Sequence, residues 1–103
     1  MIHVIATITV VAGKRSELLE QFKLIIPEVL AEQGCVAYEP TFETPTGIED
    51  MATPREDVLI MVERWETIEN LQAHLAAPHM AKFRAAVGEI VESVDLCVTE
   101  SAV

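Results

Sequence analysis

Residues 58–65 read VLIMVERW, and the architecture of the chain can be built outward from them. Its first five residues are apolar without alternation, which indicates a strand with both faces buried. Residues 2–11 and 94–100 instead alternate, as strands with two different faces do. A further strand is expected over residues 36–43. Pro40 cannot donate to a hydrogen-bond ladder, so this last strand should lie at an edge of the sheet or bulge there.

Helical patterns fill the sequence between these strands. Apolar residues at three- and four-residue spacing predict a helix over 15–33, which Pro27 should kink rather than end. Thr67 is expected to cap a short helix reaching about residue 75, and Pro78 to open another over about 78–92. Residues 44–57 form an unusually long connection, which suggests a functional flap or a mobile segment.

The resulting order, β-α-β-β-α-β, predicts a single α+β domain over residues 1–103, with a ferredoxin-like split βαβ arrangement and an antiparallel four-stranded sheet. Helices on one side would leave the other face of the 58–65 strand in water. We therefore expect a partner sheet, most simply from a second copy of the chain in a two-fold homodimer.

Composition narrows the classes of partner. The chain has 103 residues, with 17 acidic against 7 basic side chains and a net charge of −10. Such a surface repels phosphate backbones and anionic lipid, which disfavours nucleic acid and membrane partners. No secretory signal or spanning segment is recognisable, and two cysteines form neither a disulfide framework nor a zinc site. A cytoplasmic protein with reduced thiols is expected.

Common catalytic motifs are missing: the sequence has no G-x-G-x-x-G, P-loop, G-x-S-x-G, H-E-x-x-H or C-x-x-C. His74 lies three residues after Leu71, and His79 lies four before Phe83, so both imidazoles should face the interior or a cleft. Each is either a catalytic group or a satisfied core histidine. No third ligand is evident beside them, so no metal site is expected.

The remaining candidates each have a structural alternative. Trp65 is either a core residue or a pocket wall for a flat ligand, and Tyr38 is either a satisfied core tyrosine or a ligand contact. Arg64 could reach an anionic substrate group or form a salt bridge. The acidic residues near the first helix are expected to be a solvated face: Glu17, Glu20, Glu28 and Glu32.

Residues 63–80, ERWETIENLQAHLAAPHM, resemble the signature of the antibiotic biosynthesis monooxygenase (ABM) domain. Residues 26–30 (IPEVL) and 32–35 (EQGC), followed by Tyr38, resemble the first helix and second strand of the same family. The likeness is greatest to the small bacterial quinol monooxygenases, and it runs over almost the whole chain.

The resemblance implies a dimeric α/β barrel and an oxygenase that oxidises a quinol or phenolic ring with O2, without flavin, haem or metal. It places a pocket between sheet and helices, lined by Tyr38, Trp65, His74, His79 and Phe83. The haem-degrading branch has an asparagine on the first strand, where this chain offers Thr7 and Thr9, so haem degradation is not expected.

A mechanism follows from the chemistry of O2, which reacts poorly with closed-shell molecules but accepts an electron from a quinol anion. His79 or His74 would remove the phenolic proton, and Tyr38 or the other histidine would hold the second oxygen. Trp65 and Phe83 would sandwich the ring. Two alternatives remain open: an isomerase or another small-molecule enzyme on this scaffold, and a non-catalytic module that binds an aromatic ligand.

Overall fold

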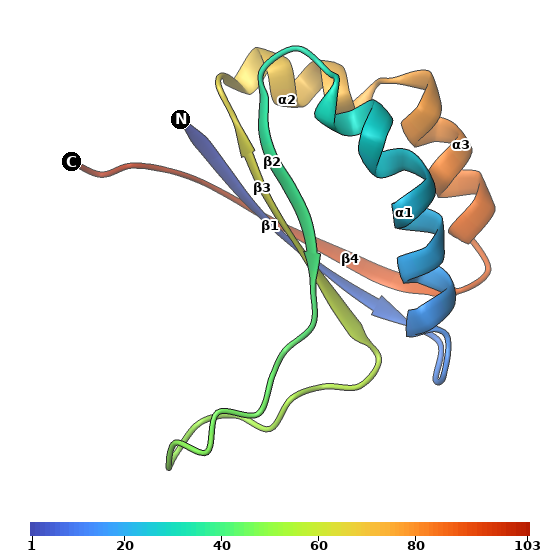
Figure 1. The fold of residues 1–103 in the computed structure, drawn as a ribbon, viewed down its shortest axis with the longest axis vertical. Helices are drawn as coiled ribbons and strands as arrows, with labels where there is room; N and C mark the ends of the chain where they lie inside the picture. Colours follow the sequence, from blue (N-terminus) through green and yellow to red (C-terminus); the bar gives the residue numbers. More distant parts are fainter.

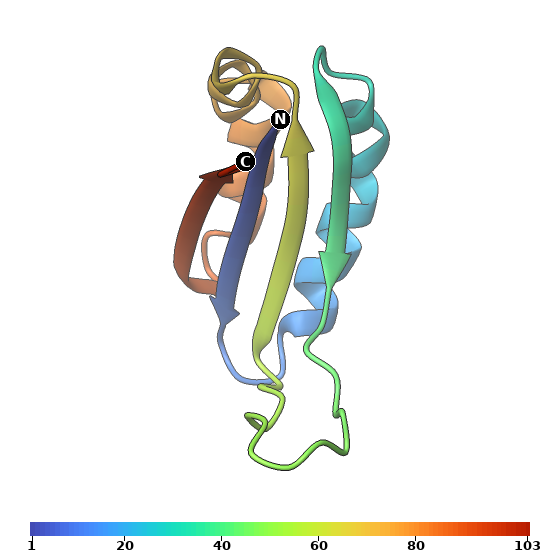
Figure 2. The same cartoon turned by 90° about the vertical axis from the view of Figure 1, so that its left-hand side faces the viewer.

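The computed structural model describes residues 1–103 and forms an antiparallel sheet covered by helices on one face (Figure 1). The elements follow in the order β1 (Ile2–Val10), α1 (Arg15–Leu30), β2 (Cys35–Thr41), β3 (Val58–Trp65), α2 (Ile68–Leu75), α3 (Pro78–Val87) and β4 (Val91–Glu100). The strand order is β2-β3-β1-β4, and Figure 2 shows the four strands side by side with the helices behind them. The predicted fold class is confirmed.

The pairing of β1 with β3 sets the two faces of the sheet. Ala6 is opposite Met61 and Ile8 is opposite Leu59, and all four side chains are buried under the helices. The alternate residues face the other side, where Ile5 remains 38% exposed. Burial therefore alternates along β3 within the chain, although its first five residues are all apolar.

Several element boundaries differ from those predicted. The first helix ends at Leu30 rather than near residue 33, and α3 ends at Val87 rather than near residue 92. Val91 instead begins β4, although it packs against the same core. Helical spacing alone could not detect this change, because a turn and a strand start can present apolar groups to the same core.

Local signals were more reliable at the remaining boundaries. Thr67 caps α2 by accepting a hydrogen bond from the Asn70 backbone N–H, as predicted. Pro27 lies inside α1 without ending it. The second strand is an edge strand, but its register shift falls between Cys35 and Ala37 rather than at Pro40.

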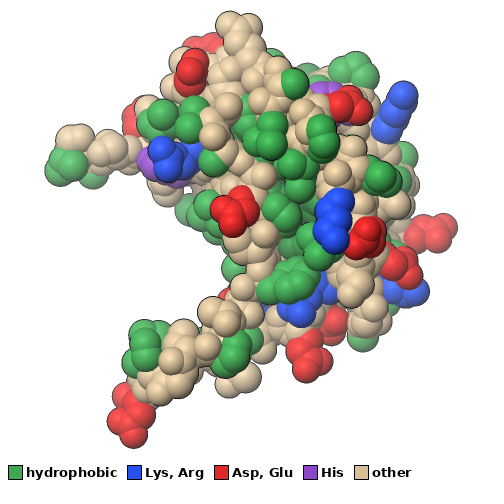
Figure 3. All heavy atoms as spheres, in the orientation of Figure 1, with side chains coloured by type: hydrophobic (Ala, Val, Ile, Leu, Met, Phe, Trp, Pro, Cys, Tyr) green, Lys and Arg blue, Asp and Glu red, His purple; other side chains and the backbone are tan.

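The connection between β2 and β3 projects from the body of the protein (Figures 1 and 3). A bidentate ion pair joins the two ends of this connection: Arg55 Nε and Nη2 donate to the Glu43 carboxylate at 2.9 and 3.0 Å. Farther out, Ile48 and Met51 are 59% and 58% exposed. The segment is therefore anchored at its base and uncovered at its tip.

Strand β4 is the second edge of the sheet, and no helix covers it. Val94, Leu96 and Val98 point to the helix side, opposite buried residues of β1, yet they are 55%, 50% and 45% exposed. The chain thus leaves an apolar strip beside its core. No helix in the structure has the length and apolar character needed to cross a membrane.

Candidate functional site

A cavity of about 230 Å³ lies between the sheet and the helices. Its walls are mostly apolar side chains from β1, β3, the three helices and the exposed strip of β4, namely Ala6, Ile8, Phe22, Met61, Leu75, Met80, Phe83, Val94 and Leu96. Four polar side chains also line it: Tyr38, Glu63, His74 and Arg84. An apolar hollow with a few convergent polar groups is typical of a small-molecule site.

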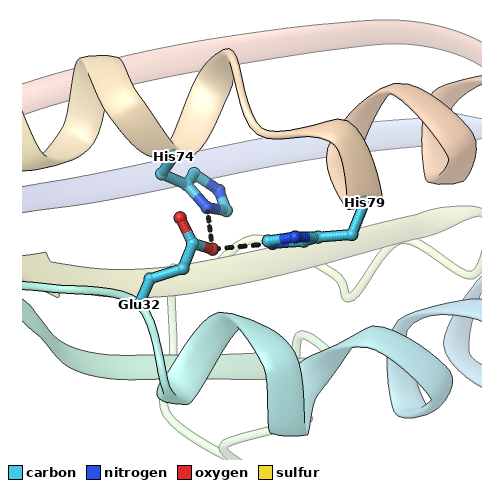
Figure 4. Close-up of side chains that lie close together, drawn as sticks. All are labelled: Glu32, His74 and His79. Carbon is cyan, nitrogen blue, oxygen red and sulfur yellow. Dashed lines mark hydrogen bonds and ion pairs between the residues drawn. The ribbon is translucent and has the colours of Figure 1, made fainter.

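Behind one wall, three side chains from separate parts of the chain converge (Figure 4). Glu32 follows the end of α1, His74 lies in the last turn of α2, and His79 lies in the first turn of α3. One carboxylate oxygen, Glu32 Oε2, is 2.8 Å from His74 Nδ1 and 2.9 Å from His79 Nε2. The carboxylate therefore links the two imidazoles.

This contact fixes the orientation of the His74 ring. A carboxylate oxygen accepts hydrogen bonds, so the geometry assigns the proton of His74 to Nδ1. The other ring nitrogen, Nε2, makes no hydrogen bond within the chain, and the residue lines the cavity. Burial lowers the pKa of His74, although Glu32 opposes this effect. The ring is therefore set up as a neutral proton acceptor.

A buried carboxyl also lines the cavity. Glu63 is 5% exposed, and its Oε1 accepts a hydrogen bond from Trp65 Nε1 at 3.0 Å. Burial raises the pKa of Glu63 to about 7, with the Trp65 hydrogen bond acting in the opposite direction. At neutral pH this carboxyl can either donate or accept a hydrogen bond.

Tyr38 and Phe83 line the cavity, as expected for both. Tyr38 pairs with Glu63 across β2 and β3, and its ring meets that of His74 edge-on at 5.4 Å between centroids. Burial raises the Tyr38 pKa well above its usual value, so the hydroxyl stays protonated. Phe83 packs on Phe22 at 4.5 Å between ring centroids.

Three predicted site residues lie elsewhere. Trp65 is fully buried behind His74, at 4.6 Å between ring centroids, and is not part of the cavity wall, so it cannot sandwich a ring there with Phe83. Arg64 projects from the open face of the sheet, because its neighbours in β3 point inward. His79 reaches Glu32 but does not line the cavity.

Two carboxylates were missed from the sequence. Glu32 was expected on a solvated face, but its side chain is only 15% exposed because both histidines hold it. Helical periodicity could not place it, since it lies beyond the end of α1. Glu63 could have been found from strand alternation, because it occupies an inward position of β3 between Met61 and Trp65.

The structure also supplies the third ligand that was not evident from the sequence. The donor atoms of Glu32, His74 and His79 all lie within 4.8 Å of one another. Two imidazoles and a carboxylate form a donor set that transition metals accept.

The fold and the cavity together define a ferredoxin-like α+β domain with a ligand-sized apolar site. The family model described as antibiotic biosynthesis monooxygenase matches residues 1–86. The chain is 39% identical over 95 residues to the protein named probable quinol monooxygenase YgiN of Escherichia coli K12, covering 89% of this chain and 90% of that protein. A protein of the same name from Shigella flexneri matches equally. This chain therefore belongs to the antibiotic biosynthesis monooxygenase family.

Solved structures share the fold. Rv0793 from Mycobacterium tuberculosis superposes with a TM-score of 0.77 at 27% identity, covering 97% of this chain and 93% of its own. PA3566 from Pseudomonas aeruginosa superposes with a TM-score of 0.80 at 20% identity, covering 99% and 94%. The resemblance drawn from residues 63–80 is thus confirmed at the level of family and fold.

Proposed function

We propose that this chain is a cofactor-independent monooxygenase that oxidises a quinol with O2. Family membership supports a monooxygenase, and the name of the E. coli relative supports a quinol as the substrate. The observation that carries the proposal is the His74 ring, which lines an apolar cavity while its Nδ1 is held by Glu32 and its Nε2 has no hydrogen-bond partner in the chain.

In the proposed reaction, a quinol hydroxyl gives its proton to His74 Nε2, and Glu32 stabilises the imidazolium from the other side. The quinolate passes one electron to O2, which gives a semiquinone and superoxide. Their recombination and loss of water yield a hydroxylated quinone, so that one oxygen atom enters the ring and the other leaves as water. The Tyr38 hydroxyl, which makes no hydrogen bond within the chain, is available for the second quinol oxygen.

The cavity volume limits the substrate. A cavity of about 150 Å³ can hold benzene, and this one has about 230 Å³. The space suits a ring system of one or two fused rings rather than a larger polycyclic phenol. We therefore expect substituted benzoquinols and naphthoquinols to be better substrates than tricyclic phenols.

The test is O2 uptake with reduced quinones in the presence of a metal chelator. His74→Ala should lower the rate by about 10²–10⁴-fold, while His3→Ala, on the open face of the sheet, should not. Glu32→Gln should lower the rate less and change its pH profile, because the carboxylate orients the base without touching the substrate. An undiminished rate in His74→Ala, a loss of activity on chelation, or tight quinol binding without O2 uptake would each contradict the proposal.

We further propose that the working form is a homodimer. Members of the family are commonly dimers, and the uncovered strip of Val94, Leu96 and Val98 adjoins the cavity. A second copy seated on this strip would bury apolar surface and shield the cavity from water. Sedimentation should show a dimer that Val98→Asp dissociates and that Leu24→Asp, an equally apolar-to-acidic change at a 70% exposed position of α1, does not. A stable monomer at micromolar concentration would refute this.

A further inference from the structure

The cluster of Glu32, His74 and His79 has more donor capacity than the proposed proton transfer requires. His79 takes no part in that step, yet its Nε2 shares the Glu32 oxygen with His74 Nδ1. The three donor atoms come from the turn after α1, from α2 and from α3, and they lie within 4.8 Å of one another. Such convergence across a chain separation of 42 and 47 residues is not a consequence of local helix spacing.

We propose that this cluster binds one divalent transition-metal ion, such as Zn²⁺, and that the bound ion blocks His74 as a base. Two histidines and one glutamate form the protein ligand set of several zinc sites, in which a fourth position is left for water. The second half of the proposal rests on the proposed function, whereas the first half does not.

To take an ion, the oxygen-to-nitrogen distances must lengthen and the two histidine nitrogens, up to 4.8 Å apart, must approach each other. With ligand bonds of about 2.0–2.1 Å, tetrahedral donors lie about 3.4 Å apart. The two oxygen-to-nitrogen distances are now 2.8 and 2.9 Å, so they would open by about half an ångström. The side chains of Glu32 and His79 are 15% and 18% exposed, which gives an ion access from the surface while His74 stays buried.

A neighbouring carboxylate supports this interpretation. His79 Nδ1 lies 3.5 Å from Glu28 Oε2, on the side of the ring away from Glu32. A histidine that binds a metal through one nitrogen usually donates the other N–H to a carboxylate, which fixes its tautomer. Glu28 can perform this function after a small movement of its exposed side chain, once His79 Nε2 carries the ion.

Metal binding changes the tautomer of His74. In the free protein Nδ1 carries the proton and Nε2 holds the lone pair. An ion can bind Nδ1 only if that nitrogen offers a lone pair. The single proton of the neutral ring must therefore move from Nδ1 to Nε2. There it turns Nε2, the nitrogen assigned to the substrate proton, from an acceptor into a donor. No net proton or electron is gained or lost by the ring, but the base is removed.

The binding test uses Co²⁺ with the intact protein, because its visible absorption reports tetrahedral nitrogen and oxygen ligands. One Co²⁺ per chain should bind and be displaced by Zn²⁺. His79→Ala should weaken binding by at least tenfold, Glu28→Gln by about tenfold, and His3→Ala not at all. Since His79 is partly exposed, its variant should keep the wild-type circular dichroism. Equal Co²⁺ affinity in wild type and His79→Ala would overturn the proposal.

The activity test separates the two halves. Zn²⁺ should inhibit O2 uptake by the wild-type protein, with a midpoint equal to its dissociation constant from the Co²⁺ competition. In His79→Ala the midpoint should move up by the same factor as the affinity. Inhibition that is unchanged in His79→Ala would refute the blocking role. A wild-type protein that binds Co²⁺ but oxidises no quinol would refute the proposed function and leave the metal site standing.

Discussion

Replacing Glu63 by glutamine tests the electrostatics of the cavity through protein stability. Burial raises the pKa of this carboxyl from 4.5 to about 7 in the folded chain. A raised carboxyl pKa means that the folded state binds more protons than the unfolded state between these two values. The free energy of unfolding contributed by Glu63 is therefore complete below pH 4.5 and falls as the pH rises to 7.

The size of this effect follows from the shift. Each pKa unit corresponds to about 1.4 kcal/mol, so ionising Glu63 in place costs about 3 kcal/mol at pH 8. Glutamine has no charge to bury, and its side-chain oxygen can still accept the Trp65 Nε1–H bond. Relative to wild type, Glu63→Gln should therefore gain about 3 kcal/mol of stability between pH 4.5 and pH 8.

The assay is urea denaturation followed by circular dichroism at pH 4.5, 6 and 8. Glu66→Gln is the control, because it makes the same substitution at an exposed position directly after Trp65. Any fixed cost of placing an amide in the core cancels when the variant is compared with itself across pH. If the difference between Glu63→Gln and wild type is the same at pH 4.5 and pH 8, the assigned cause is wrong.

Two further predictions concern the segments that position the cluster. Gly34 has φ +78°, and an added Cβ would collide with the Asn70 side chain, so Gly34→Ala should destabilise the chain by more than Gly13→Ala. At Gly13, with φ +81° and open space, only the backbone strain of about 1–2 kcal/mol applies. Thr67→Ala should cost about 1 kcal/mol by removing the cap of α2. Thermal and urea unfolding check both, and equal losses at the two glycines would contradict the first.

The parts of the site that could be predicted from sequence are those set by local periodicity. The three-residue spacing from Leu71 placed His74 on the inward face of its helix, and His74 is 1% exposed. The same reasoning gave the element order and the cap at Thr67. These features depend on which face of one element is apolar, and a single segment of sequence carries that information.

The parts that could not be predicted depend on contacts between distant segments. Glu32 meets His74 and His79 only because the end of α1 packs near the junction of α2 and α3. Trp65 was a plausible cavity wall from its place in the strand. It is instead sealed in the core, where its indole N–H is taken by Glu63. Strand alternation fixes the face of such a residue, but not whether a hollow opens beside it.

Glu32 and Glu63 have different roles in the proposed reaction. The chain has a net charge of −10, which disfavours the approach of an anion, so the quinol would enter neutral and be deprotonated inside. Glu32 lies behind His74 and stabilises the imidazolium that forms. Glu63 lines the cavity that would hold the quinolate, and only its protonated form can donate a hydrogen bond to a quinolate oxygen. The burial that makes Glu63 costly to ionise thus also keeps a second negative charge away from the substrate anion.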